Sequence, residues 1–103
     1  MKIVSKAMLV EFYNNTAYQD SKPALEAWYD IAKLAKWTCP QDVKATFGNA
    51  SIVGNNRVVF NIKGNDYRLI VAFAYRMGFC YVKFIGTHTQ YDAVDAATVD
   101  MSQ

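Results

Sequence analysis

Alternation of apolar and polar residues dominates the second half of the chain. It runs through residues 57–63 (RVVFNIK), 66–76 (DYRLIVAFAYR) and 79–86 (FCYVKFIG). A period of two residues is typical of β-strands, because successive side chains point to opposite faces of a sheet. The three segments therefore predict three consecutive strands.

Short turns separate these strands and set their predicted pairing. Gly64 and Asn65 lie between the first two strands, where glycine supplies the positive φ that a two-residue hairpin needs. Met77 and Gly78 give a weaker turn signal between the next two, so the strands should form an antiparallel meander. The expected pairs are Lys63–Asp66, Asn61–Arg68, Val59–Ile70 and Arg57–Ala72 in the first hairpin, and Arg76–Phe79, Ala72–Lys83 and Arg68–Thr87 in the second.

The first half of the chain has the longer spacing of amphipathic helices. Residues 5–15 fit a short helix, and residues 16–37 fit a longer one. Asp20 or Ser21 can cap the longer helix, and Pro23 is tolerated in its first turn. The apolar stripe of this helix is expected to pack in the core, and it consists of Leu25, Trp28, Ile31, Ala32 and Ala35.

The pattern of elements predicts the fold class. Pro40 should end the long helix, and residues 42–56 fit either a short helix or an irregular segment. Two N-terminal helices followed by an antiparallel sheet predict an α+β fold. With 103 residues, 52% of them hydrophobic and 19% charged, the chain is expected to form one domain over residues 1–103.

Targeting signals and cysteine usage favour a cytosolic protein. No apolar run is long enough to span a membrane, and residues 1–15 lack the apolar core and cleavage site of a signal peptide. In the cytosol, Cys39 and Cys80 are expected to be reduced thiols. One histidine and two separated cysteines do not suggest a metal site.

The formal net charge is only +2, but the positive charges are concentrated between residues 57 and 88. In the expected register, the sheet face that packs on the helices contains Val58, Phe60, Ile62, Leu69, Val71, Phe73, Val82 and Phe84. The opposite face carries the cations of this segment, namely Arg57, Lys63, Arg68, Arg76 and Lys83, interleaved with Val59, Ile70 and Ile85. Arginine beside tyrosine suits RNA phosphates and bases, although a solvated sheet face would account for the same charges.

His88 is the only histidine, and its orientation is ambiguous. Strict alternation places it opposite Tyr67, on the packed side of the sheet. A bulge at Gly86 would turn the following side chains over. Alternatively, the strand ends at Gly86 and residues 87–92 wrap the edge of the sheet. Both arrangements stay open from the sequence.

Three motifs carry a family resemblance, namely the hairpin VFNIKGNDYRLI, the strand YVKFIGTH and the tail THTQYDAVDA. Together with the preceding helices, they resemble the HigB-type toxins of bacterial toxin–antitoxin pairs, which belong to the RelE-like superfamily. The similarity covers nearly the whole chain, and its C-terminal motifs are the more specific part.

The resemblance implies a RelE-like toxin that enters the ribosomal A site and cuts mRNA during translation. The implied reaction is attack of a ribose 2′-hydroxyl on the adjacent phosphate, with no metal or other cofactor. It requires a base, an acid and cations that stabilise the transition state. A cognate helix-turn-helix antitoxin, similar to HigA, is the implied partner besides mRNA and the ribosome.

The resemblance also assigns roles to individual residues. Arg68 of the YRLI motif is expected to stabilise the transition state, and Lys63 lies where related toxins place a lysine or arginine. In GTHTQY, His88 replaces an arginine of RelE-like relatives, and Tyr91 approximates their tyrosine. Histidine can act as a base or an acid whereas arginine only stabilises charge, so the identity of the base is open. RNA contacts are expected from Arg57, Asn61, Arg76 and Lys83.

Each candidate also has a purely structural interpretation. The alternatives are ion pairs Arg68–Asp92 and Lys63–Asp66, a hydrogen bond from His88 to Tyr67 or Asp92, and simple packing of Tyr91. Arg76 lies at the far hairpin end, where it could contact the ribosome or the antitoxin. The competing functions are a non-catalytic RNA- or ribosome-binding module and a degraded toxin kept for its partner interaction.

Overall fold

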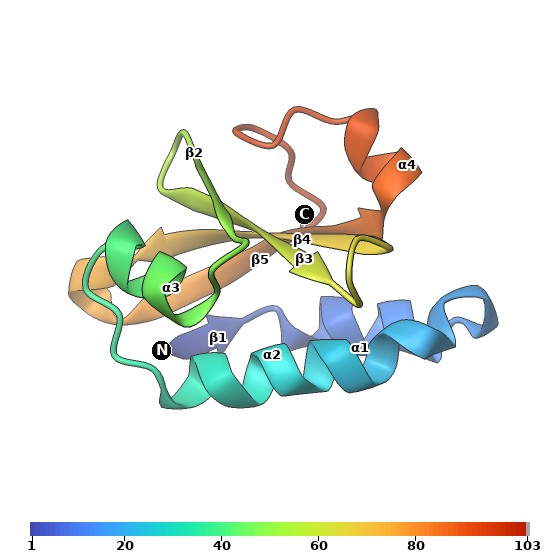
Figure 1. Ribbon diagram of the computed structural model, residues 1–103, viewed down its shortest axis with the longest axis horizontal. Helices are drawn as coiled ribbons and strands as arrows, with labels where there is room; N and C mark the ends of the chain where they lie inside the picture. The colour runs from blue at the N-terminus through green and yellow to red at the C-terminus, as the bar shows by residue number, and fades with distance from the viewer. Residues whose placement is uncertain (103) are drawn as a thin grey trace.

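The computed structural model describes residues 1–102, in which one five-stranded sheet packs against two helices (Figure 1). The strand order is β1-β5-β4-β3-β2. The strands are β1 (Lys2–Val4), β2 (Ser51–Val53), β3 (Arg57–Ile62), β4 (Tyr67–Ala74) and β5 (Phe79–Thr87). The helices are α1 (Lys6–Asn14), α2 (Lys22–Leu34), α3 (Pro40–Thr46) and α4 (His88–Asp92), with 3₁₀ segments η1 (Thr16–Ser21) and η2 (Tyr75–Met77).

The α+β fold and the β3-β4-β5 meander confirm the prediction, but the sheet is larger than expected. β2 pairs antiparallel with β3, and β1 pairs parallel with β5. Each of these edge strands has only three residues, too few for a periodic signal. The ambiguous segment 42–56 divides between α3 and β2.

The long predicted helix is shorter than expected. Its first part, Thr16–Ser21, is a 3₁₀ segment, and α2 ends at Leu34. Pro40 therefore does not end this helix; it occupies the first turn of α3, where its missing N–H costs no hydrogen bond. The predicted side-chain cap is also wrong, because the Ser21 hydroxyl donates to the Tyr18 carbonyl and no side chain caps α2.

The first hairpin has the predicted register. Asn61 pairs with Arg68, and Arg57 pairs with Ala72. Gly64 has a φ of 64°, the conformation that the turn requires. The Asp66 N–H closes the turn by donating to the Lys63 carbonyl at 3.2 Å.

The second hairpin departs from the predicted register. Its turn includes the 3₁₀ segment η2, so Ala74 rather than Arg76 faces Phe79. Further along, Ile70 pairs with Phe84 while Val71 pairs with Val82. Lys83 is thus the extra residue of a β-bulge.

A bulge reverses the side chains that follow it. Phe84 therefore lies on the face away from the helices, and Ile85 lies on the helix face, the opposite of the expectation for both residues. Of the two arrangements that the sequence left open, neither is formed as stated, because the bulge is at Lys83 and β5 continues through Gly86 to Thr87. Gly86 has a different role, because a Cβ there would lie 2.7 Å from the Phe84 ring and 2.8 Å from Gln90 Oε1.

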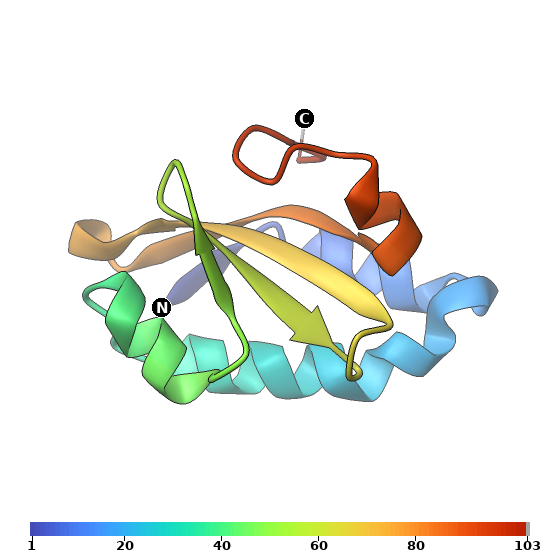
Figure 2. The same ribbon diagram turned by 45° about the horizontal axis from the view of Figure 1, so that its top comes forward.

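Both faces of the sheet are covered, giving three layers. The main core lies between the sheet and the helices, and it includes Leu9, Leu25, Trp28, Phe60, Leu69 and Val82. The chain after α4 folds back over the other face, where Val94 and Val99 pack on Val59, Ile70 and Phe84 (Figure 2). We refer to residues 93–102 as the C-terminal segment.

Candidate functional site

Two loops meet at one end of the sheet and bring most of the candidate residues together. The β3–β4 turn lies beside the junction of β5 and α4, at the right of Figure 1. Arg68 pairs with Gly86 across the strands, and the His88 N–H donates to the Asp66 carbonyl at 3.1 Å. Five of the eight predicted residues lie at this end, which we call the Arg68 site: Asn61, Lys63, Arg68, His88 and Tyr91.

Arg68 is half-buried and has no acidic partner among residues 1–102. Its Nη1 donates to the carbonyls of Asn65 at 2.9 Å and Tyr67 at 3.3 Å. The ion pair with Asp92 that the sequence allowed is not formed. An arginine held by backbone carbonyls keeps its full charge and its remaining N–H donors for an anion.

Tyr91 lies next to this arginine. The Arg68 guanidinium carbon is 5.7 Å from the centre of the Tyr91 ring, a cation–π distance. The other contact of Tyr91 is with Phe84, at 6.4 Å between ring centres. Tyr91 therefore packs on the sheet and also faces Arg68, so both of its interpretations are compatible with the geometry.

His88 is the first residue of α4 and points to solvent. Thr87 and Gln90 form a capping box that fixes the start of this short helix. His88 Nδ1 lies 3.2 Å from Asp92 Oδ2, while 54% of the histidine side chain is exposed. The contact with Asp92 therefore involves Nδ1 and not Nε2.

Lys63 has acidic partners that the sequence did not reveal in full. Its ammonium lies 2.7 Å from Asp20 and 3.4 Å from Asp66. The Tyr67 hydroxyl also donates to Asp20, and no hydrogen bond joins the side chains of His88 and Tyr67 among residues 1–102. Asp20 was expected only as a helix cap, and nothing local in the sequence links it to a lysine 43 positions away.

The hydrogen bonds of this cluster shift the protonation of its members. The contact with Asp20, and then that with Asp66, raises the pKa of Lys63. The same contacts with Lys63 and Tyr67 lower the pKa of Asp20, whose hydrogen bond in turn raises the pKa of Tyr67 to about 12. These contacts therefore favour the protonated, positively charged form of Lys63.

The prediction that the cations of one sheet face are open to solvent is wrong for Arg57 and Lys83. Arg57 is only 8% exposed, and its Nη1 donates to the carbonyls of Ala96 and Val99 in the C-terminal segment. Lys83 forms an ion pair with Asp100 at 3.2 Å. Because this segment covers both cations, a direct RNA contact of either remains a prediction that requires the segment to move.

The sequence model of one family matches residues 21–94, and this family is described as the RelE-like toxic component of a toxin–antitoxin system. The chain belongs to the HigB toxin family. No curated protein matches it by sequence. The match covers the whole Arg68 site and ends at Val94, so most of the C-terminal segment lies beyond it. Family membership makes the chain the toxic component of a pair and implies an antitoxin as its partner.

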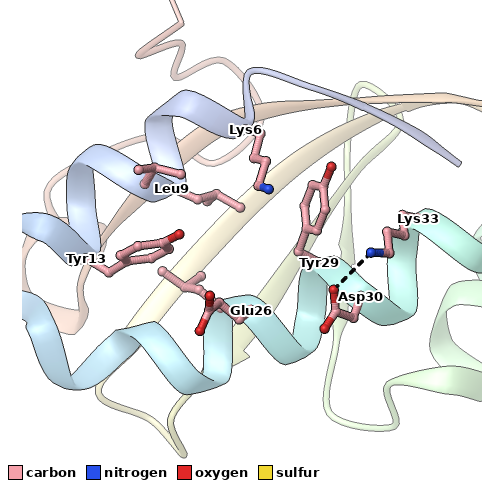
Figure 3. A pocket seen from close by; sticks show the side chains of 9 residues that line it. Lys6, Leu9, Tyr13, Glu26, Tyr29, Asp30 and Lys33 are labelled. Carbon is pink, nitrogen blue, oxygen red and sulfur yellow. Dashed lines mark ion pairs between the residues drawn. The ribbon is translucent and has the colours of Figure 1, made fainter.

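Other surfaces of this HigB toxin differ from the Arg68 site in their charge balance. A hollow of about 260 Å³ between α1 and α2 contains Lys6 and Lys33, together with Glu26 and Asp30 (Figure 3). Lys33 forms an ion pair with Asp30 at 3.3 Å, and Lys6 lies over Tyr29. The acids compensate the cations of this hollow, so it does not favour an anion.

The remaining features of the toxin concern metals, thiols and membranes. Among residues 1–102 no group of three or more histidine, cysteine or acidic side chains is placed to hold a metal. Cys39 and Cys80 are free thiols, as expected. No helix within the described residues has the length and apolar character needed to cross a bilayer.

Proposed function

We propose that this HigB toxin is an endoribonuclease that cuts mRNA on the ribosome and is inhibited by a cognate helix-turn-helix antitoxin. The observation that carries the proposal is the uncompensated guanidinium of Arg68 beside Tyr91 and the exposed His88. A cation without an acidic partner attracts a phosphate, and groups that exchange protons lie at the same edge. Ribosome dependence and the type of antitoxin rest on the family relation.

The proposed reaction is an internal transfer at one phosphate. The ribose 2′-hydroxyl attacks the adjacent phosphorus and loses its proton to a base. The bond from phosphorus to the 5′-oxygen breaks, and that oxygen receives a proton from an acid. The products are a 2′,3′-cyclic phosphate and a 5′-hydroxyl, and no other reactant is required.

Each residue of the site has a distinct role in this proposal. Arg68 stabilises the negative charge that builds up on the phosphate oxygens. His88 exchanges a proton with the substrate, with Asp92 holding its ring in place. Lys63 contributes positive charge only, because its raised pKa keeps it protonated. Tyr91 holds the guanidinium through its ring and offers its hydroxyl as a second proton donor.

Brief expression followed by mapping of mRNA 5′ ends tests the proposal. The wild-type toxin should produce new ends inside translated codons, and Arg68→Ala should abolish them. Lys33→Ala is the matched control, because it removes an exposed charge on α2 that pairs only within its own helix. Absence of new ends with soluble wild-type protein would contradict the proposal.

A non-catalytic RNA- or ribosome-binding module is the second candidate. Two observations favour it, because Lys63 is paired with two acids and Tyr91 packs on Phe84. His88→Gln and Tyr91→Phe distinguish the two functions. Variants that bind ribosomes normally but lose toxicity support catalysis, whereas unchanged toxicity of both would remove these residues from the mechanism.

A further inference from the structure

A second group of cations lies at the opposite end of the sheet from the Arg68 site. It surrounds a hollow of about 390 Å³ where the start of β1, the chain after α2 and the β4–β5 turn meet. In Figure 1 these segments lie at the left, beside the N-terminus, whereas α4 lies at the right. We call this hollow the far-end pocket; its polar and aromatic lining includes Lys2, Lys36, Trp37, Tyr75 and Arg76.

The positive charge of the far-end pocket is not compensated. No acidic residue lines it, and the side chains of Lys36 and Arg76 have no ion pair or hydrogen bond among residues 1–102. Lys2 lies over the Phe79 ring, at 5.6 Å from its centre. Asp42 does not line the pocket, although its charge acts on Tyr75, and its carboxylate accepts hydrogen bonds from the backbone N–H and the hydroxyl of Thr38. The hollow in Figure 3 differs, because acids line it too.

The framework of the pocket is fixed by backbone contacts. The Lys2 N–H donates to the Gly78 carbonyl at 2.8 Å, which ties β1 to the β4–β5 turn. Gly78 has a φ of 73°, a conformation that glycine adopts without strain and that closes the 3₁₀ segment η2. Arg76 is therefore presented at a defined place rather than on a free loop.

Tyr75 is a further residue that lines the same pocket. Its ring stacks on Phe73 with centres 5.1 Å apart, and its hydroxyl is buried without a partner among the described residues. Burial raises the pKa of Tyr75 to about 12, so the hydroxyl keeps its proton at neutral pH. The hydroxyl is closed off from solvent, so the cations are the groups that an anion entering the pocket can reach.

We propose that the far-end pocket binds phosphate groups of an RNA segment other than the one that is cut. The inference rests on the proposed function, in which the toxin works inside a ribosome and is surrounded by ribosomal RNA. The three cations Lys2, Lys36 and Arg76 suit phosphate oxygens, and contacts to phosphate position a protein without reading sequence. The molecule is 36 Å long, so contacts at both ends would fix its orientation while Arg68 engages the mRNA.

The test compares two double charge reversals that change the net charge equally. Lys36→Glu/Arg76→Glu alters the far-end pocket, and Lys22→Glu/Lys33→Glu alters exposed lysines on α2. All four side chains are exposed, and thermal melting of each variant checks its folding. The dissociation constant for intact ribosomes is measured by co-sedimentation at several salt concentrations.

The pocket variant is expected to bind ribosomes about tenfold more weakly than the control variant at physiological salt. Its plot of log affinity against log salt should also be shallower by about 2, because two phosphate contacts are lost. Equal affinity of the pocket and control variants for ribosomes would overturn the proposal. A pocket variant that binds ribosomes normally but no longer binds the antitoxin would also overturn it, because the pocket would then be a contact for the antitoxin.

Cleavage assays on the same proteins separate this proposal from the proposed function. Wild-type toxin that binds ribosomes through the pocket but cuts no mRNA would refute the nuclease and leave the pocket standing. Wild-type toxin that cuts mRNA, together with a pocket variant that binds and cuts like the control, would refute the pocket alone.

Discussion

Replacing Arg57 by methionine separates a structural role from the RNA contact predicted by the sequence. The guanidinium donates to the carbonyls of Ala96 and Val99, and methionine keeps an apolar stem of similar length without the donors. Hydrogen bonds from a charged group each stabilise a protein by roughly 1.5–3 kcal/mol, and the freed carbonyls regain part of this from water. We expect Arg57→Met to lower the free energy of unfolding by about 2–4 kcal/mol.

Thermal denaturation followed by circular dichroism measures this loss. For a domain of this size about 1 kcal/mol corresponds to 4–8 °C, so the melting temperature should fall by at least about 8 °C. Limited proteolysis should cut first within the C-terminal segment. Arg76→Met is the matched control, because Arg76 is exposed and its change should leave the melting temperature nearly unaltered. A melting temperature for Arg57→Met equal to that of the control, with weakened RNA binding, would refute the structural role.

Three further predictions concern other parts of the fold. Gly86→Ala should destabilise the toxin by roughly 1–3 kcal/mol in urea denaturation, because its Cβ would overlap the Phe84 ring. The pKa of Tyr67 is raised to about 12 by Asp20, so its contribution to stability is complete below pH 10 and is lost as the pH rises toward 12. Asp20→Asn should move the Tyr67 transition in an ultraviolet titration to lower pH. Burial raises the pKa of the Cys80 thiol to about 12, so a thiol reagent should label Cys39 in the folded protein and Cys80 only after unfolding.

Each of these predictions has a result that contradicts it. Gly48→Ala is the control for Gly86→Ala, because a Cβ at Gly48 would contact nothing within 4 Å. Equal stability of the two variants would mean that Gly86 is not needed for close packing. An unchanged Tyr67 titration in Asp20→Asn would remove Asp20 as the cause of the shift. Labelling of Cys80 in the folded protein at the rate of Cys39 would contradict its burial.

Local signals in the sequence predicted the first hairpin because a glycine marks its turn. Gly64 supplies the positive φ, and the pairing of Asn61 with Arg68 follows from the turn length. The predicted register of the β4–β5 hairpin was wrong because the residues Met77-Gly78 do not reveal the 3₁₀ segment η2 in the turn. Alternation does not reveal the bulge at Lys83 either. The segment FCYVKFIG fits a strand with the bulge as well as a strand without it.

The sequence could place those site residues that lie close to the ends of the predicted strands. Arg68 lies in β4 and His88 directly follows β5. The predicted antiparallel meander therefore placed both residues at the same end of the sheet. Asp66, three positions from Lys63, was an expected partner, whereas Asp20 lies 43 positions from Lys63 and the partners of Arg57 lie 39 or more positions from it, in segments without a predicted contact. Long-range pairing of this kind depends on how the elements pack, which residue types alone do not specify.

Cleavage of RNA by the Arg68 site during translation can be measured with purified toxin and translating ribosomes. Wild-type protein should yield mRNA fragments that end in a 2′,3′-cyclic phosphate, and Arg68→Ala should yield none at equal ribosome occupancy. Fragments from Arg68→Ala at the wild-type rate, or ribosome binding by wild type without any cleavage, would contradict cleavage by this site.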